Sequence, residues 1–417
     1  MSELQITGGR NLSGHVYIHG AKNSVLPILA ASVLIPGTTV IHNCPRLSDV
    51  EASLAILNHL GCKTKREDDT VIIDAASPMR CDIPDRLMRE MRSSVIFLGA
   101  VLARMKRAKM SMPGGCELGP RPIDLHLSAL REMGAQVLEG AGGLDCTAEE
   151  LIGREITLAL PSVGATENIM LAACGAQEIT TIINAAREPE IVDLQNFLNA
   201  MGAHVRGAGS STIAIEGGCQ FHGGAYTVMG DRIVAATYLA ATASAGGDVT
   251  VEGVDWRHLS TVTAVFREAG CDVRSERNGV RLICPGLLRS VRPIHTAPYP
   301  GFPTDAQAPV MAALTKGRGT TVFVENMFEN RYRHVDELIR MGADIRVQDR
   351  VAVVSAMPRL HGSSVRAADL RGGAALVVAA LGAEGETTVS GLHHIDRGYA
   401  SLEEDLRALG AEIQRLE

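Results

Sequence analysis

The stretch LSALREMGA, Leu127–Ala135, decides how the chain folds, because the end of this segment recurs six times. In each copy an amphipathic helix pattern runs into a glycine, and the residues that follow open a strand. Glycine at this place supplies the left-handed residue that ends a helix. The recurrence predicts six structural units of about 70 residues. Their helix-ending glycines are Gly61, Gly134, Gly202, Gly270, Gly342 and Gly410.

A second pattern recurs in the same units, as an alanine-rich helix followed by a turn and a Thr/Val-rich strand. Examples are IMLAACGAQEITTII (169–183) and PVMAALTKGRGTTVFV (309–324). Small side chains allow close packing, so we expect these helices in the interior with sheets outside them. An α/β solenoid is the alternative, but it would carry polar caps at its ends. We therefore predict an α/β protein in which three units close into one domain, twice over, with a crossing near Gly230.

Length and composition agree with two domains and exclude several classes of function. The 417 residues exceed one ordinary core. The net charge of −7 and the 3% aromatic content argue against nucleic-acid binding and against attraction to anionic membranes. No apolar run is long enough to span a bilayer, and the start lacks a signal-peptide pattern. Nine cysteines without a C-x-x-C pair indicate reduced thiols and a cytoplasmic location.

One loop is the first candidate for chemistry. The stretch MPGGCELGPRPIDLH (112–126) places Cys116 among glycines and prolines, with Arg121 five residues later. A thiol on a glycine-rich loop beside a cation is typical of a reactive cysteine. The alternative is a small apolar residue that fills a turn, since free cysteines are mostly buried and inert.

Three more residues lie at predicted helix starts, and each has a functional and a structural interpretation. Lys22 in HGAKNSVLP suits anion binding, although a solvated lysine is the favoured interpretation from this stretch alone. Arg92 opposes a helix macrodipole, which mildly favours an anionic ligand there. Asp305 in YPGFPTDAQAP is either a helix N-cap or a general base.

Arginines occur near helix starts in several units, at Arg331, Arg371 and Arg397. Each alone is typical of a surface ion pair, but as a set they indicate a shared anionic site. The fingerprints of P-loop, zincin and dinucleotide-binding proteins are missing from the sequence. We expect neither a metal nor another cofactor.

The chain resembles the UDP-N-acetylglucosamine 1-carboxyvinyltransferases, which are enolpyruvyl transferases, over essentially residues 1–417. The motifs that carry this resemblance are GAKN (20–23), PGGCELGPRPIDLH (113–126), PSVGATENIMLAA (161–173), NAAREPEIVDL (184–194), PGFPTDAQA (300–308), ENMFENRYRHVDEL (325–338) and HIDRGY (394–399).

The resemblance implies two inside-out α/β barrel domains, each of three repeated units. One domain would comprise residues 22–229 with the Cys116 loop. The other would comprise residues 1–21 and 230–417, with the active site in the cleft between the two domains. The implied reaction transfers the enolpyruvyl group of phosphoenolpyruvate to the 3'-hydroxyl of UDP-N-acetylglucosamine and releases phosphate, as the first committed step of peptidoglycan synthesis.

The resemblance also implies roles for individual residues. Asp305 would take the proton from the sugar hydroxyl, and Cys116 would protonate the methylene carbon of phosphoenolpyruvate and be alkylated by fosfomycin; Lys22 and Arg397 also count as catalytic. Phosphoenolpyruvate would contact Lys22, Asn23, Arg121, Arg371 and Arg397. The UDP-sugar would contact Arg92, Arg121, Pro122, Ile123, Asp124, Leu125, Ser162, Val163, Gly164, Asp305, Met327 and Arg331.

Two departures and two rivals accompany this interpretation. Gly230 and Val234 replace a proline and a glutamate that the family commonly has, which predicts a looser hinge at the crossing. One rival is an enolpyruvyl transferase for another acceptor, such as shikimate 3-phosphate or a nucleotide. The other is a weakly active paralogue that binds the UDP-sugar to regulate the pathway. An oligomeric partner is not indicated by the sequence.

Overall fold

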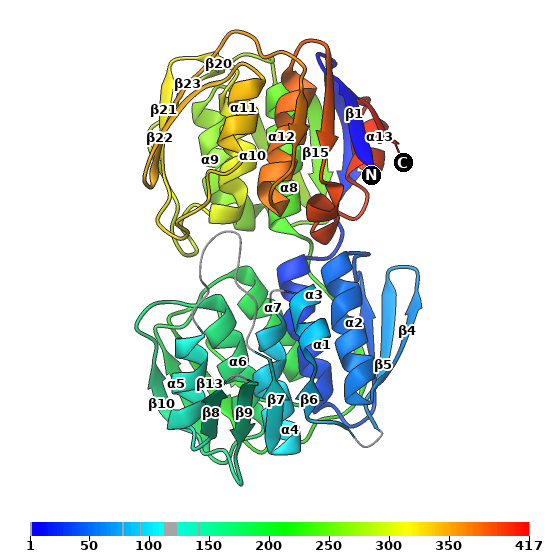
Figure 1. Cartoon of the computed structure of the whole chain (residues 1–417), viewed down its shortest axis with the longest axis vertical. Helices are drawn as coiled ribbons and strands as arrows, with labels where there is room; N and C mark the ends of the chain where they lie inside the picture. Colours follow the sequence, from blue (N-terminus) through cyan, green and yellow to red (C-terminus); the bar gives the residue numbers. More distant parts are fainter. Residues whose placement is uncertain (1, 77–78, 92, 112–122, 141, 417) are drawn as a thin grey trace. The chain divides into compact units, whose positions relative to one another are not determined.

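The computed structural model describes residues 2–76, 79–91, 93–111, 123–140 and 142–416. Its described residues form two compact units (Figure 1). The described residues between 20 and 229 form the middle unit, and the described residues 2–19 and 230–416 form the terminal unit. Each unit has a large apolar core of its own.

The six helix-ending glycines behave as the sequence predicts. All six have positive φ angles, between 93° and 108°. Each lies within two residues of the end of a helix, where a side chain would strain the left-handed backbone. These helices are α2 (Ser48–Leu60), α5 (Asp124–Glu132), α7 (Pro189–Ala200), α9 (Ser260–Glu268), α11 (Val335–Arg340) and α13 (Leu402–Ala408).

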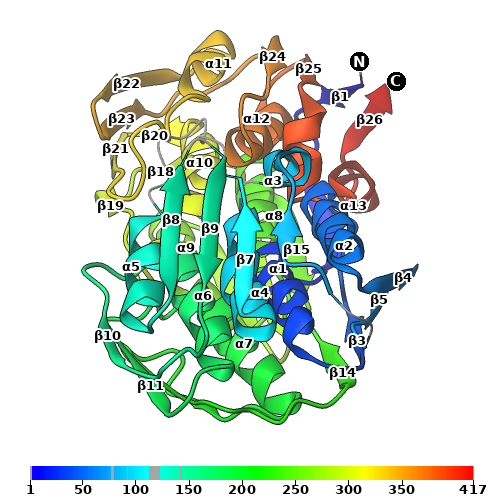
Figure 2. The same cartoon turned by 60° about the horizontal axis from the view of Figure 1, so that its bottom comes forward.

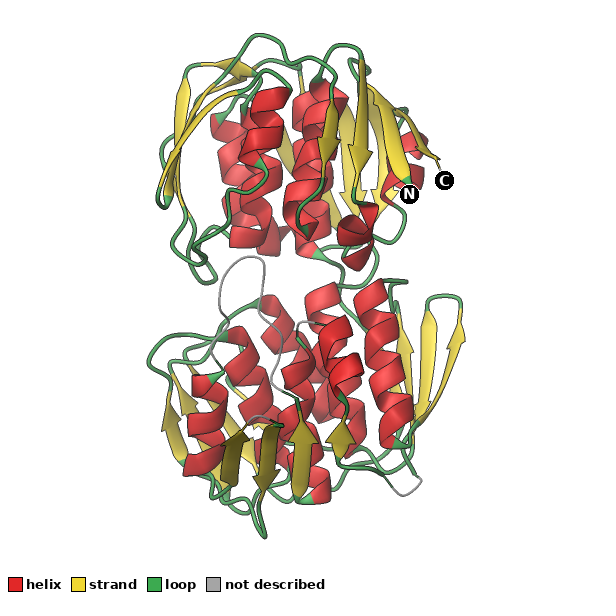
Figure 3. Cartoon of the chain, viewed as in Figure 1, coloured by secondary structure: helices red, strands yellow, loops and turns green. Residues whose placement is uncertain are grey.

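The alanine-rich helices lie in the interior, with the sheets around them (Figure 3). Small residues permit this packing: a Cβ added to Gly99 would lie only 2.3 Å from the carbonyl oxygen of Asn168 on the neighbouring helix. The interior helices of the middle unit are α1 (Lys22–Ala31), α4 (Phe97–Met105) and α6 (Val163–Cys174). Those of the terminal unit are α8 (Arg232–Ala245), α10 (Thr304–Leu314) and α12 (Leu370–Gly382).

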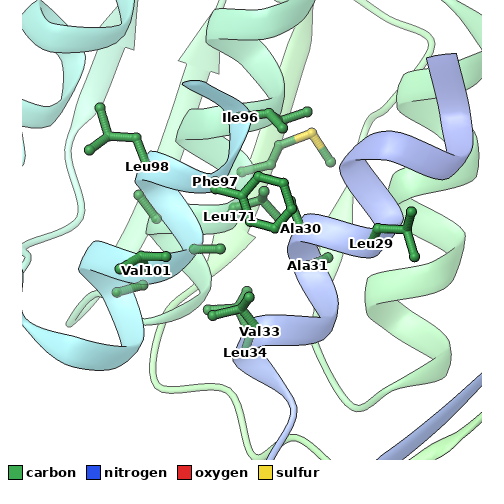
Figure 4. Packing of buried hydrophobic residues seen from close by; sticks show 14 of the residues in the cluster. Leu29, Ala30, Ala31, Val33, Leu34, Ile96, Phe97, Leu98, Val101 and Leu171 are labelled. Carbon is green, nitrogen blue, oxygen red and sulfur yellow. The ribbon is translucent and has the colours of Figure 1, made fainter. Parts of the chain in front are cut away.

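Apolar side chains from all three interior helices meet in the core of the middle unit (Figure 4). Ala30 of α1 lies near Phe97 of α4 with Leu171 of α6 beside them, and Leu29 of α1 and Val101 of α4 belong to the same core. All five are fully buried. Burial of each leucine, valine or phenylalanine side chain stabilises the folded state by about 1.5–3 kcal/mol.

The described part of the middle unit contains three four-stranded sheets, seen from below in Figure 2. In hydrogen-bonded order the first is β14 (Gly224–Thr227), β3 (Thr38–His42), β5 (Thr70–Asp74) and β4 (Lys63–Glu67). The second is β6 (Asp82–Ile83), β7 (Arg107–Met110), β9 (Gly143–Thr147) and β8 (Gln136–Gly140). The third is β10 (Glu155–Thr157), β11 (Ile179–Ile183), β13 (Thr212–Glu216) and β12 (Val205–Arg206).

The described part of the terminal unit repeats this plan. Its sheets are β16 (Asp272–Glu276), β17 (Gly279–Cys284), β15 (Gly247–Glu252) and β2 (Leu12–Tyr17); β19 (Ile294–His295), β21 (Thr320–Val324), β23 (Val351–Ser355) and β22 (Asp344–Gln348); and β24 (Ser364–Arg366), β25 (Glu386–Ser390), β1 (Glu3–Thr7) and β26 (Glu412–Leu416). The terminal unit also contains a short strand pair, β18 (Leu288–Arg289) with β20 (Gly317–Arg318), and the small helices η3 (Trp256–Leu259) and η4 (Leu392–Arg397). The small helices of the middle unit are η1 (Ser32–Leu34), α3 (Asp85–Glu90) and η2 (Ser94–Ile96).

Each full sheet in the described chain has a parallel edge pair and antiparallel pairing elsewhere. Alternating burial along β5 or β11 turns one face of each sheet toward the helices. The predicted α/β class with three repeated units in each domain is confirmed. No helix in the described ranges is long and apolar enough to cross a membrane.

The structure accounts for glycine at position 230. A Cβ added there would lie 2.0 Å from the carbonyl oxygen of Gly253, so the two backbones approach too closely for a side chain. Val234 lies in the first turn of α8. Its N–H donates to the carboxylate of the N-cap residue, Asp231, at 3.0 Å.

Candidate active site

The carboxylate of Asp305 is bound by two arginines within the terminal unit. The proline-rich segment before α10 ends at Pro303, which takes the N-cap position, so Asp305 is the second helical residue. Arg331 donates to Asp305 Oδ1 at 2.7 Å, and Arg371 donates to Oδ2 at 3.3 Å. Both arginine side chains are 3% exposed, whereas that of Asp305 is 29% exposed. The N-cap alternative for Asp305 is therefore wrong.

Arg371 is held at the start of α12. The N-cap carboxylate of Asp369 accepts from the backbone N–H groups of Arg371 and Gly372, at 3.1 and 2.9 Å. Burial disfavours the charge of Arg371, but Tyr399, Asp305 and Asp231 together raise its pKa above the ordinary value. The guanidinium therefore stays charged, and the interpretation as a surface ion pair does not apply to it.

Glu325 connects Thr304, the residue before Asp305, to Met327. Glu325 is fully buried. Its Oε2 accepts from the Thr304 hydroxyl at 3.0 Å, and its Oε1 accepts from the backbone N–H of Met327 at 2.8 Å. Arg331 also donates to the carbonyl of Thr304 at 3.0 Å. This network fixes the start of α10 and holds the half-exposed Met327 beside it.

Lys22 lies in the middle unit, as the first residue of α1. Its Nζ lies 2.6 Å from Asp49 Oδ2, and the two side chains are 11% and 2% exposed. The favoured expectation of a solvated lysine is therefore wrong. Because separating the partners of a buried ion pair leaves an uncompensated charge, Asp49 keeps the lysine in place. Asn23, the next residue, is partly buried.

Two predicted sugar-binding segments lie side by side in the middle unit. Ile123, Asp124 and Leu125 form the start of α5, and Ser162, Val163 and Gly164 form the start of α6. The hydroxyl of Ser162 caps α6 by accepting from the N–H of Ala165 at 3.3 Å. A Cβ added to Gly164 would lie 3.1 Å from the ring of His126, so the two helix starts nearly touch.

His126 is a buried neutral histidine behind these segments. The side-chain oxygen of Asn168 accepts from the N–H of Gly99 at 2.7 Å, which fixes the orientation of the amide. The amide nitrogen of Asn168 therefore donates to His126 Nδ1 at 2.8 Å, and this nitrogen carries no proton. Burial lowers the pKa of His126 to about 4.

This pKa predicts a stability that depends on pH. The folded-state pKa lies below the unfolded value of about 6.5, so the contribution is present above pH 6.5 and is lost as pH falls toward 4. The loss amounts to about 3 kcal/mol at most. The free energy of unfolding, measured with urea, should therefore fall less between pH 7 and pH 4 in His126→Gln than in wild type. His361→Gln, which changes an exposed histidine, is the control. An unchanged pH slope in His126→Gln would contradict the assignment.

The remaining predicted residues are distributed as follows. Arg397 is the last residue of η4 in the terminal unit and is partly buried. Arg92, Cys116, Arg121 and Pro122 lie outside the described residues. Within the described ranges, no group of three or more His, Cys, Asp or Glu residues could hold a metal ion.

Sequence reasoning missed four residues that contact the predicted site residues: Asp49, Glu325, Asp369 and Tyr399. Asp369 had a usable signal, because it directly precedes a predicted helix start and is a favoured N-cap residue. The others had none, since each also contacts a residue distant in sequence.

The comparisons with known proteins agree with this architecture. The chain matches the solved enolpyruvyl transferase NikO from Streptomyces tendae with a TM-score of 0.88 and 26% identity, over 99% of this chain and 98% of that one. It also matches an EPSP synthase from Acinetobacter baumannii with a TM-score of 0.76 and 20% identity over both complete chains, which shows the fold alone. The fold is therefore that of the enolpyruvyl transferases.

Sequence comparison leads to the family. The model for EPSP synthase (3-phosphoshikimate 1-carboxyvinyltransferase) matches residues 6–406. UDP-N-acetylglucosamine 1-carboxyvinyltransferase 2 from Caldanaerobacter subterraneus subsp. tengcongensis is 50% identical over 100% of both chains. UDP-N-acetylglucosamine 1-carboxyvinyltransferase 1 from Halalkalibacterium halodurans is 46% identical, over 100% of this chain and 95% of its own. The protein belongs to this family of enolpyruvyl transferases and is an enzyme.

Proposed function

We propose that the protein transfers the enolpyruvyl group of phosphoenolpyruvate to the 3'-hydroxyl of UDP-N-acetylglucosamine and releases phosphate. The observation that carries the proposal is the 50% identity over the full length to a relative named for this activity. The buried arginine pair around the partly exposed carboxylate of Asp305 supports it, because proton transfer beside an anionic substrate needs these groups. The reaction would supply peptidoglycan synthesis in the cytoplasm.

The proposed chemistry balances in two steps. Asp305 takes the proton of the 3'-hydroxyl while the sugar oxygen attacks C2 of phosphoenolpyruvate, and Cys116 gives a proton to C3. The product is a tetrahedral phosphate-bearing ketal. The Cys116 thiolate then takes a proton back from C3 while phosphate leaves C2 and accepts the proton held by Asp305, which gives the enol ether. General acid and base catalysis of this kind accelerates a reaction by roughly 10²–10⁴-fold for each group.

We assign the anionic groups of phosphoenolpyruvate to Lys22, Asn23, Arg121, Arg371 and Arg397. We assign the UDP-sugar to Arg92, Arg121–Leu125, Ser162–Gly164, Met327 and Arg331. The adjacency of the starts of α5 and α6 supports this second assignment for the middle unit, because helix N-termini attract the phosphates of a nucleotide diphosphate.

Phosphate release is the direct test. Purified enzyme is mixed with phosphoenolpyruvate alone, with UDP-N-acetylglucosamine added, and with shikimate 3-phosphate added. We expect release only with the UDP-sugar. Release only with shikimate 3-phosphate would favour the rival acceptor. Tight binding of the UDP-sugar without any release would favour the regulatory paralogue.

Replacing Cys116 with aspartate is expected to keep turnover and abolish irreversible inactivation by fosfomycin. A carboxylic acid can still donate a proton, but it lacks the thiolate that the epoxide alkylates. The measurement is residual activity after incubation with fosfomycin and removal of unbound drug. Irreversible inactivation of Cys116→Asp would show that another group is the target.

A further inference from the structure

The guanidinium of Arg371 is held from two sides, and the proposed chemistry uses only one of them. Its Nη2 donates to Asp305 Oδ2 at 3.3 Å, and its Nη1 donates to the hydroxyl oxygen of Tyr399 at 3.2 Å. The centre of the guanidinium also lies 5.5 Å from the centroid of the Tyr399 ring. Tyr399 is 4% exposed. A buried neutral hydroxyl therefore shares the arginine with the carboxylate.

The hydrogen bonds fix the direction in which Tyr399 donates. The hydroxyls of Tyr399 and Thr237 lie 2.7 Å apart. Thr237 is inside α8, and its own proton goes to the carbonyl oxygen of Ile233 at 3.0 Å. We therefore assign the proton between the two hydroxyls, either of which could donate, to Tyr399. Burial raises the pKa of Tyr399, so the phenol keeps this proton.

The result is a chain of donors that runs from Arg371 through Tyr399 and Thr237 to the backbone of α8. Because Tyr399 gives its proton to Thr237, its oxygen accepts a hydrogen bond from Arg371, which can only donate. The ion pair of Asp305 with Arg331, at 2.7 Å, is much shorter than the one with Arg371, at 3.3 Å. Arg371 therefore contacts Asp305 at a longer distance than Arg331 does, while its other amino group is bound to the phenol.

We propose that Tyr399 and Thr237 are positioning residues that keep Arg371 oriented for the anionic substrate. The inference rests on the proposed function, since it gives Arg371 the task of binding phosphoenolpyruvate. A pre-oriented cation needs little reorganisation when the anion arrives, whereas a guanidinium free to turn must be reoriented by the substrate. Loss of these hydrogen bonds should therefore weaken the binding of phosphoenolpyruvate more than the binding of the UDP-sugar.

Four variants separate orientation from packing. Tyr399→Phe removes the hydroxyl, and Thr237→Val removes its acceptor while keeping the shape of the side chain. Thr237→Ser keeps the hydroxyl and removes a methyl group. Tyr238→Phe is the matched control. Tyr238 is a second buried tyrosine, located on α8, and its hydroxyl donates to Asp405 Oδ2 at 2.5 Å. For each, KM for both substrates, kcat and thermal stability are measured.

We expect Tyr399→Phe and Thr237→Val to raise KM for phosphoenolpyruvate about tenfold, consistent with a hydrogen bond to a charged group. KM for the UDP-sugar should change little, Thr237→Ser should stay near wild type, and Tyr238→Phe should lose stability without the change in KM. Equal KM values in wild type and Tyr399→Phe would overturn the inference. So would a Thr237→Ser enzyme as impaired as Thr237→Val, which would indicate packing.

Failure of the proposed function gives a different result. In that case wild-type enzyme releases no phosphate with the UDP-sugar, whatever the variants do. Calorimetry with phosphoenolpyruvate then decides the inference directly, since unchanged affinity in Tyr399→Phe, or no binding to wild type, overturns it.

Discussion

Asp305→Asn is expected to slow turnover by about 10²–10⁴-fold, the range over which a positioned general base accelerates a reaction. An asparagine oxygen can still accept from Arg331, so the start of α10 should keep its shape. The amide cannot take a proton from the sugar hydroxyl. The measurement is kcat from phosphate release at saturating concentrations of both substrates, together with the affinity for the UDP-sugar.

The control for this variant is Asp248→Asn. Asp248 forms a bidentate pair with Arg281, at 2.8 and 2.6 Å, on a partly exposed part of the terminal unit. It therefore reports the cost of an Asp-to-Asn change beside an arginine away from the site. Asp305→Asn should also be less stable than this control, because Arg331 and Arg371 are buried and lose a counter-charge. Turnover close to wild type would remove Asp305 from the mechanism and leave it a structural carboxylate.

Lys22→Met is expected to abolish phosphate release and to lower the free energy of unfolding by about 3–5 kcal/mol, the cost of removing one partner of a buried pair. The loss of stability arises at Asp49, whose carboxylate is 2% exposed and would no longer face the lysine charge. Urea unfolding gives the stability, and phosphate release gives the activity.

The double variant Lys22→Met/Asp49→Leu separates the two effects. Replacing both charges with apolar side chains of similar size is often neutral for stability. We therefore expect the double variant to regain most of the lost stability while staying inactive. Regained activity would mean that Lys22 serves only to neutralise Asp49, which would contradict its assignment to phosphoenolpyruvate.

The sequence predicted the fold well because the decisive signals are local. A glycine at the end of an amphipathic helix, such as Gly134 or Gly342, needs only the residues beside it to adopt a left-handed conformation. Likewise, a helix of small residues has to be buried against close neighbours, as α10 and α12 are. Both signals can therefore be read from neighbouring residues without knowing which distant residues they contact.

The site was less predictable because its contacts join distant residues. Lys22 was expected in solvent, since nothing near it in sequence indicates that Asp49 would come within 2.6 Å. The hydroxyl of Tyr399 meets Thr237 across 162 residues, and no local pattern encodes such a pairing. The sequence pattern predicted that arginines near helix starts share a site, and two of them, Arg331 and Arg371, do meet at the carboxylate of Asp305.

The position of the first strand has a consequence for synthesis on the ribosome. Strand β1 lies between β25 and β26, and β2 pairs with β15, so residues 3–17 join strands that are made much later. The middle unit, by contrast, is one continuous segment that can fold as soon as it emerges, since domains generally fold as units. β2 must therefore wait unpaired until β15 is translated, and β1 must wait until the final repeat is translated. Deleting β1 would leave the facing edges of β25 and β26 open to pairing with another chain.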